Sequence, residues 1–157
     1  MKYVFVLSFM FLAKSDTPPI NKKVVEYVDT VIGKKVDRGE CWDLAAAALD
    51  YAGAYLDRSN QKNIYVFGKV INPKQEEIFQ GDIIQMENVK VEYTRDNGIY
   101  TESMPHHTAI VYKVLEKDRF KIAHQNTSFS GKKVGISEFS LGDLQKGKIT
   151  FYRPYKK

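Results

Sequence analysis

Residues 39–44, with the sequence GECWDL, place the only cysteine of the chain where a glycine-containing turn passes into an amphipathic helix. The first turn of a helix carries free N–H groups and about half a positive charge, and both stabilise a thiolate. The same N–H groups, those of Cys41 and Trp42, can also hold the negative oxygen of a tetrahedral intermediate. We therefore predict that Cys41 is a nucleophile. The alternative is that Cys41 is a small buried apolar residue.

The composition indicates one compact folded domain. The chain has 157 residues, of which 43% are hydrophobic and 27% charged, and a domain takes ~100–200 residues. A net charge of +5, without a concentrated basic stripe, does not indicate a nucleic-acid partner. A single cysteine excludes both an internal disulfide framework and a cysteine-rich zinc site.

The amino terminus has the pattern of an export signal. Lys2 precedes an apolar run over residues 3–13 that only Ser8 interrupts, and this run is shorter than the ~20 residues of a membrane span. We expect residues 1–13 to be a signal peptide, residues 14–157 to be the catalytic domain, and the exported protein to have no stable membrane span. A buried first strand is the alternative for residues 3–13.

Hydrophobic spacing predicts helices first and strands afterwards. Apolar residues recur at helical spacing over residues 17–33 and 41–56. From residue 60 onward the period falls to two, and turn residues separate the strand candidates. The turn at Lys117-Asp118 predicts a hairpin, and residues 151–154 are expected to form a closing edge strand. This order indicates an α+β domain with an antiparallel sheet. The predicted strands are 64–67, 82–86, 89–93, 107–114, 119–126, 134–136 and 148–153, and residues 97–105 are a predicted connecting loop beside the cleft.

A thiolate nucleophile needs a base, and the sequence offers three histidines. Strand alternation puts His107 on one face with Ala109 and Val111, and we expect it to look across these small residues toward the helix. His106 then points the other way. On the next strand, alternation puts His124 and Asn126 on one inward face and turns Lys121, Ala123 and Gln125 outward. Either His124 or Asn126 can then hydrogen-bond the far nitrogen of His107.

These motifs together resemble the papain-like cell-wall amidohydrolases, which comprise the CHAP (cysteine, histidine-dependent amidohydrolase/peptidase) domains and the NlpC-type cysteine peptidases. The resemblance covers about three quarters of the chain and depends on the order of the motifs. The motifs are GECW at residues 39–42, GDIIQ at 81–85, HTAIV at 107–111 and HQN at 124–126. Two positions differ from the CHAP pattern: His124 stands where CHAP domains have glutamate, and Glu40 stands where many have glutamine.

The resemblance implies a papain-like fold, with the helices packed on a partly barrel-like sheet, and a cysteine amidase or peptidase that needs no metal or cofactor. It implies Cys41 as nucleophile, His107 as base and His124 as third member, with Asn126 as the alternative third member. The implied substrate is an amide bond of peptidoglycan, cleaved outside the cytoplasm by a monomer. Two other functions stay open: an acyltransferase or transglutaminase-type enzyme, in which an amine accepts the acyl group, and a non-catalytic peptide-binding module.

Overall fold

The computed structural model describes residues 16–157 and begins with two helices, α1 (Pro19–Val31) and α2 (Cys41–Ala52). The predicted signal peptide over residues 1–13 lies outside the described residues. In α1, Val24 and Val28 are fully buried, as the helical spacing predicts. Helix α2 is one turn shorter than predicted, because Gly53 adopts a left-handed conformation with φ 65° and ends it. Neither helix within residues 16–157 has the length and apolarity of a membrane span.

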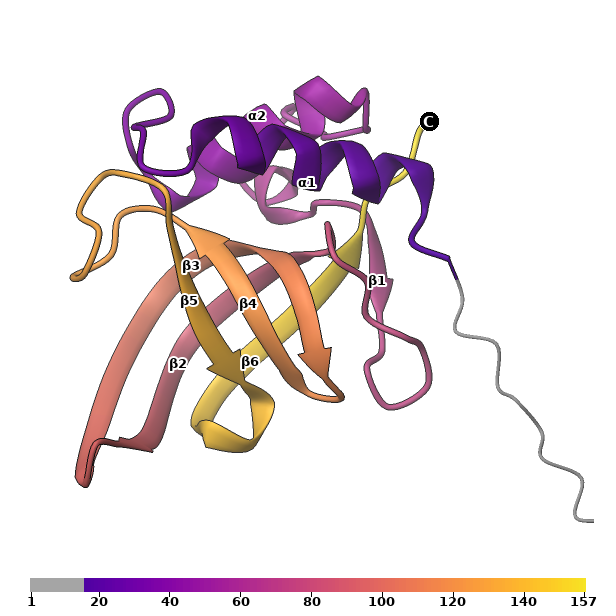
Figure 1. The fold of residues 1–157 in the computed structure, drawn as a ribbon. Helices are drawn as coiled ribbons and strands as arrows, with labels where there is room; N and C mark the ends of the chain where they lie inside the picture. Colours follow the sequence, from indigo (N-terminus) through magenta and orange to yellow (C-terminus); the bar gives the residue numbers. More distant parts are fainter. Residues whose placement is uncertain (1–15) are drawn as a thin grey trace, which may run out of the picture.

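The rest of the chain forms one antiparallel sheet of six strands in the order β1-β6-β2-β3-β4-β5. The sheet curves but does not close into a barrel, and α1 and α2 lie together along one side of it, while the β2–β3 hairpin extends away from them (Figure 1). The α+β class is therefore confirmed. The strands are β1 (Lys69–Ile71), β2 (Ile83–Arg95), β3 (Gly98–Glu116), β4 (Arg119–His124), β5 (Gly135–Ser140) and β6 (Leu144–Arg153).

Several predicted element boundaries are wrong. The predicted strands 82–86 and 89–93 are one strand, β2, which Asn88 kinks with a φ of 51°. The predicted loop 97–105 belongs to β3, which pairs with β2 from the turn at residues 96–97 onward. Residues 151–153 pair with β1, and residues 151 and 152 pair also with β2, so β6 lies inside the sheet and not at its edge. The hairpin at Lys117-Asp118 is confirmed by the pairing of β3 with β4.

Residues 64–67 do not form a strand. Residues Asn63–Tyr65 instead make a single 3₁₀ turn. The Asn60 side chain accepts hydrogen bonds from the N–H groups of Lys62 and Asn63, at 2.9 and 3.0 Å, and the indole of Trp42 donates to the Ile64 carbonyl at 2.6 Å. These bonds satisfy backbone groups that would otherwise pair in a sheet.

Both faces of the central sheet are buried, in two separate apolar layers. On the helix side, Ile83, Ile110 and Ala123 pack with the apolar faces of α1 and α2. On the opposite side, residues from the strands and from the segment between β1 and β2 make the second layer, among them Ala109, Ile122 and Ile78. The prediction that Ala123 faces outward is wrong, because β4 is covered on both sides.

A buried ion pair joins the ends of the fold. The Asp82 carboxylate, with no side-chain exposure, accepts hydrogen bonds from Arg153 Nη2 at 2.9 Å and Arg153 Nε at 3.1 Å. Asn21 Nδ2 donates to the same carboxylate at 2.8 Å. Burial raises the pKa of Asp82, and the contacts with Arg153 and Asn21 oppose that rise. The pair therefore ties α1 and β6 to the start of β2.

Candidate active site

Cys41 is the first residue of α2, and the turn before it is built as the sequence predicts. Gly39 has a φ of 88°, in the left-handed region that favours glycine. The N–H of Glu40 donates to the Asp43 carboxylate at 3.0 Å, and the N–H of Asp43 donates to the Glu40 carbonyl at 3.1 Å. The N–H groups of Cys41 and Trp42 belong to the first helical turn, which offers them no intrahelical acceptor. They are therefore available to an oxyanion.

An ion pair stabilises this helix start. Arg38 Nη2 lies 2.6 Å from Asp43 Oδ1, and the Asp43 side chain is fully buried. The carboxylate lies in the first turn of α2, where the helix dipole favours negative charge.

The end of β4 holds the segment that precedes Cys41. The amide of Gln125, fully buried, donates to the carbonyls of Glu40 at 2.7 Å and Val36 at 3.1 Å, and accepts from the Val36 N–H at 3.2 Å. Gln125 directly follows His124, so these bonds bring Cys41 to the end of the strand that carries His124. Sequence reasoning placed Gln125 on an outward face and missed this function.

Two histidines and a serine form a hydrogen-bonded row next to that strand end. His107 Nε2 and His124 Nδ1 lie 3.0 Å apart, and His124 Nε2 lies 2.9 Å from Ser137 Oγ. The two rings are 7% and 6% exposed, so water competes little for these bonds. Ser137 was missed because a single serine in a strand carries no motif. Only the pairing of β4 with β5, which sets Ser137 beside Ile122, reveals it.

Burial keeps both histidines neutral. It lowers the pKa of His107 to about 4, with a smaller effect from the nearby His106. Burial also lowers the pKa of His124 to about 3, with a smaller effect from His107. At neutral pH the row therefore contains two uncharged imidazoles, and His107 is in the form that can act as a base.

The faces of β3 are the reverse of the expectation. His107 lies opposite Met86, on the side of Ala109 and the second apolar layer, and not toward the helices. His106 lies on the helix side, where its ring meets Tyr65 edge-on at 4.3 Å. Within residues 16–157 the Cys41 thiol has no hydrogen-bond partner. Catalytic hydrogen bonds are often long or unformed before substrate binds.

The two candidates for the third position separate clearly. The ring of His124 lies at hydrogen-bond distance from His107. Asn126 lies beyond the end of β4 with a φ of 62°, which breaks the strand alternation and turns its side chain to Glu40. Its amide Nδ2 donates to the Glu40 carboxylate at 2.8 Å. Lys132 Nζ lies 2.9 Å from the same carboxylate, so the negative charge beside the oxyanion site is neutralised.

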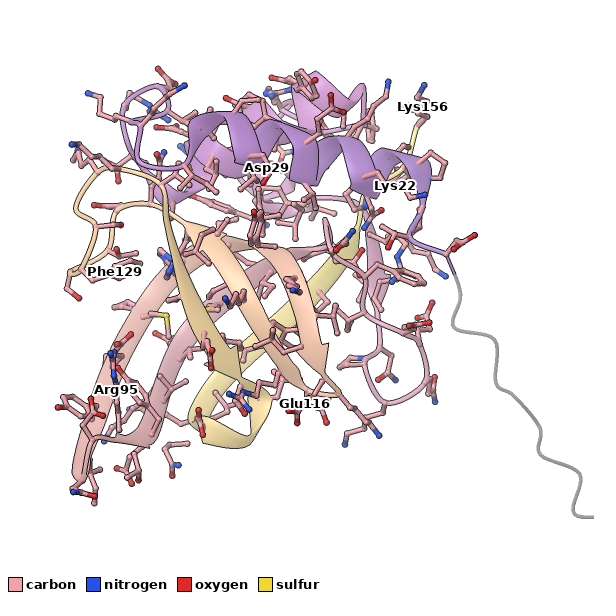
Figure 2. The ribbon with its side chains drawn as sticks, in the orientation of Figure 1. Lys22, Asp29, Arg95, Glu116, Phe129 and Lys156 are labelled. Carbon is pink, nitrogen blue, oxygen red and sulfur yellow. The ribbon has the colours of Figure 1, made fainter. Side chains whose placement is uncertain are left out.

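An exposed aromatic ring flanks the histidines. Phe129 is 57% exposed, and its ring centroid lies 5.4 Å from that of His124. It sits on the turn made by Thr127 and Gly131, at the side of the molecule where that turn projects (Figure 2). No sequence motif marks this residue.

The hydrogen-bonded row contains two histidines and a serine, and it lacks the third ligand that a metal site needs. No three histidine, cysteine, aspartate or glutamate side chains within residues 16–157 are grouped so that they could hold a metal ion.

In this fold two helices precede an antiparallel sheet, the cysteine begins a helix and two histidines pair on neighbouring strands. These features together define a cysteine proteinase-fold domain. The family model of the AIM3/BBC1 cysteine proteinase-fold domain matches residues 19–157, and the chain belongs to this family.

Comparison with known proteins adds one relative and a solved fold. Altered inheritance of mitochondria protein 3 from Debaryomyces hansenii is 30% identical over an alignment of length 147 that covers 83% of this chain. The chain spans about 15% of the length of that relative. The crystal structure of Ly7917 is 22% identical, with a TM-score of 0.47, over 84% of this chain and 62% of Ly7917. The structure of Ly7917 with the hydrolyzing product of MDP is 21% identical, with the same TM-score, over 85% and 63%.

Proposed function

We propose that this domain hydrolyses amide bonds, with Cys41 as nucleophile, His107 as general base and acid, and His124 as the residue that orients His107. The observation that carries the proposal is the buried contact of 3.0 Å between His107 Nε2 and His124 Nδ1, beside the strand end that holds the start of α2. Membership of a cysteine proteinase-fold family supports the same chemistry.

The hydrogen-bonded row supports one tautomer of His107, in which Nδ1 is the basic nitrogen. In the proposed tautomer His107 Nε2–H donates to His124 Nδ1, and His124 Nε2–H donates to Ser137 Oγ. This leaves the lone pair of His107 on Nδ1, where it can accept the thiol proton of Cys41. A pKa near 4 keeps that nitrogen unprotonated in the resting enzyme.

The reaction then follows the two stages of covalent catalysis. The Cys41 sulfur attacks the carbonyl carbon while His107 takes the thiol proton, and the developing oxyanion binds the N–H groups of Cys41 and Trp42. His107 returns the proton to the leaving nitrogen, the C–N bond breaks, and an amine leaves behind a thioester. Water then attacks the thioester with His107 as base, and the carboxylic acid and the free thiol are released.

The substrate that we propose is an amide linkage of peptidoglycan, reached after export directed by residues 1–13. The support is the order of the four motifs, which resembles that of the CHAP domains, and the low net positive charge, which suits an anionic wall polymer. Lys132 and Asn126 remove one objection to this assignment, because they neutralise the carboxylate of Glu40.

Digestion of purified peptidoglycan, followed by separation of the fragments by mass spectrometry, tests both parts of the proposal. Wild-type protein should release fragments with new amino and carboxyl termini, and the Cys41→Ala variant should release none. A panel of unrelated peptides, digested in parallel, separates a wrong substrate from a wrong reaction. Cleavage of peptides but not peptidoglycan overturns the substrate, and equal cleavage by Cys41→Ala overturns the reaction. Products that carry an added amine would identify an acyltransferase instead.

A further inference from the structure

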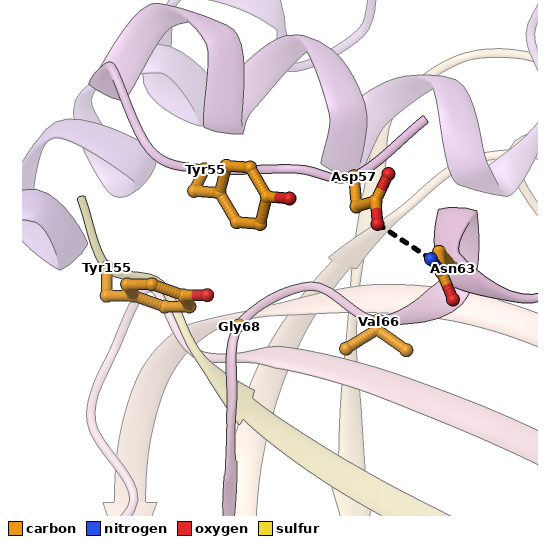
Figure 3. Close-up of a pocket in the computed structure, with 6 residues that line it drawn as sticks. All are labelled: Tyr55, Asp57, Asn63, Val66, Gly68 and Tyr155. Atoms are coloured by element: carbon orange, nitrogen blue, oxygen red, sulfur yellow. Dashed lines mark hydrogen bonds between the residues drawn. The ribbon is translucent and has the colours of Figure 1, made fainter. Parts of the chain in front are cut away.

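A pocket lies away from the histidine row. Two tyrosines, a carboxylate and an amide are among the groups that line it. Its volume is about 210 Å³, and Figure 3 shows Tyr55 and Tyr155 one above the other at one end, with Asp57 and Asn63 at the other. The two ring centroids lie 5.8 Å apart, and the N–H of Tyr55 donates to the Tyr155 carbonyl at 2.8 Å. The pocket walls are therefore held by backbone as well as side-chain contacts. Its lining residues are Tyr55, Asp57, Asn63, Val66, Gly68 and Tyr155.

The carboxylate of Asp57 gives the pocket a fixed negative charge. Its oxygens accept hydrogen bonds from the Ser59 N–H at 2.8 Å and from Asn63 Nδ2 at 2.7 Å. These bonds, the one from Ser59 first, lower the pKa of Asp57. The side chain is thus ionised at neutral pH and held in one orientation.

The structure already places one ammonium group against this pocket. Lys157 Nζ lies 4.6 Å from the centre of the Tyr55 ring, within the range of a cation–π contact, and 3.5 Å from the Tyr55 hydroxyl. Its charge also acts on Asp57. An ammonium group is therefore compatible with the faces that these side chains present.

We propose that the pocket binds an organic ammonium cation, the head group of a lysine side chain or of its N-methylated forms, and that Lys157 competes for it. Two tyrosine rings and a carboxylate are the groups that recognise such cations. A volume of about 210 Å³ is below the ~300–1,000 Å³ of a site for a drug-sized molecule, so it suits a head group. The two oxygens of Asp57 already accept hydrogen bonds, which disfavours a guanidinium that needs both of them.

One hydrogen bond connects the segment that lines the pocket to the start of α2. Asn63 and Val66 line it, while the carbonyl of Ile64, between them, accepts the hydrogen bond of Trp42, the second residue of α2. Binding is nevertheless measured without turnover, so its failure leaves the proposed hydrolysis untouched.

Nuclear magnetic resonance titration of the full chain tests the proposal with four blocked amino acids: trimethyllysine, lysine, norleucine and arginine, each N-acetylated and C-methylamidated. The tyrosine ring signals of the pocket should shift in a saturable way with one or both lysine forms. The better lysine form should bind about fivefold more tightly than the uncharged norleucine derivative. Comparison of the two lysine forms shows whether methylation matters. Equal binding of norleucine, or tightest binding of arginine, overturns the proposal.

Variants identify the pocket. Asp57→Asn, which keeps the shape of the side chain, and Tyr55→Leu should each remove most of this preference. Lys157→Gln should raise affinity about two- to fivefold, because the competing ammonium is gone. Tyr100→Leu, which alters a tyrosine stacked on Tyr93 in the β2–β3 hairpin, is the matched control and should bind as wild type. Unchanged binding by Asp57→Asn or weaker binding by Lys157→Gln overturns the proposal, even if Tyr55→Leu fails to fold.

Discussion

Acid should destabilise this domain through the buried pair His107 and His124. In the folded protein burial lowers the pKa of His107 from 6.5 to about 4 and that of His124 to about 3. The unfolded chain therefore binds more protons than the folded one between these values and pH 6.5. The stability that these groups contribute is fully present above pH 6.5 and is lost as the pH falls toward 4.

The magnitude follows from the size of the shift. For His107 alone, the free energy of unfolding should fall by about 2–3 kcal/mol between pH 7.5 and pH 4.5. His124 acts in the same direction, and because the rings share a hydrogen bond the first proton belongs to the pair. The loss is therefore assigned to the pair and not to either residue.

Urea unfolding at a series of pH values measures this loss. The double variant His107→Gln/His124→Gln removes both titrating groups and should lose at least about 2–3 kcal/mol less than wild type between pH 7.5 and pH 4.5. Carboxylates titrate in both proteins, so the difference isolates the histidines. His106→Gln, which alters an exposed residue with only the smaller effect on the pKa of His107, is the control and should keep most of the wild-type loss. An equal loss in wild type and the double variant would refute the reasoning.

Three further predictions concern the frame of the site. Arg153→Met leaves a buried carboxylate without its cation and should lower the free energy of unfolding by about 3–5 kcal/mol in urea titrations. The control Arg95→Met, at the exposed hairpin tip, should change it by less than about 0.5 kcal/mol. Similar losses in the two variants would contradict the importance of the buried pair. Gln125→Met removes the hydrogen bonds to the segment before α2 and should cost about 1–3 kcal/mol and slow hydrolysis; wild-type kinetics would show that this anchor does not position the nucleophile. His124→Ala should reduce kcat/KM by orders of magnitude and Asn126→Ala by much less, and the reverse order would exchange their functions.

The sequence predicts the two helices and the hairpin at Lys117-Asp118 because their signals are local. Helical spacing fixes α1 and α2, and the turn residue Asp118 adopts the left-handed φ of 64° that a tight turn favours. The position of Cys41 at the start of α2 follows from the same local pattern. The fold class then depends only on the order of these elements.

The faces of β3 and β4 could not be predicted, because both are buried. Alternation groups His107 with Ala109, but it does not show which of two apolar layers carries the helices. The predicted inward placement of Asn126 fails for a different reason. Asn126 adopts a left-handed conformation, which asparagine tolerates more readily than most residues, so alternation stops at His124. Ser137 and Phe129 reach the histidines only through tertiary contacts.

The central claim is that His107 activates Cys41, and the rate of alkylation by iodoacetamide tests it most directly, because the chain has one cysteine. At pH 6–7 folded wild-type protein should react faster than a free thiol of pKa about 8.5. His107→Ala should lose this excess, whereas His106→Ala should keep it. Reaction of Cys41 only after denaturation, or equal rates in wild type and His107→Ala, would contradict the account.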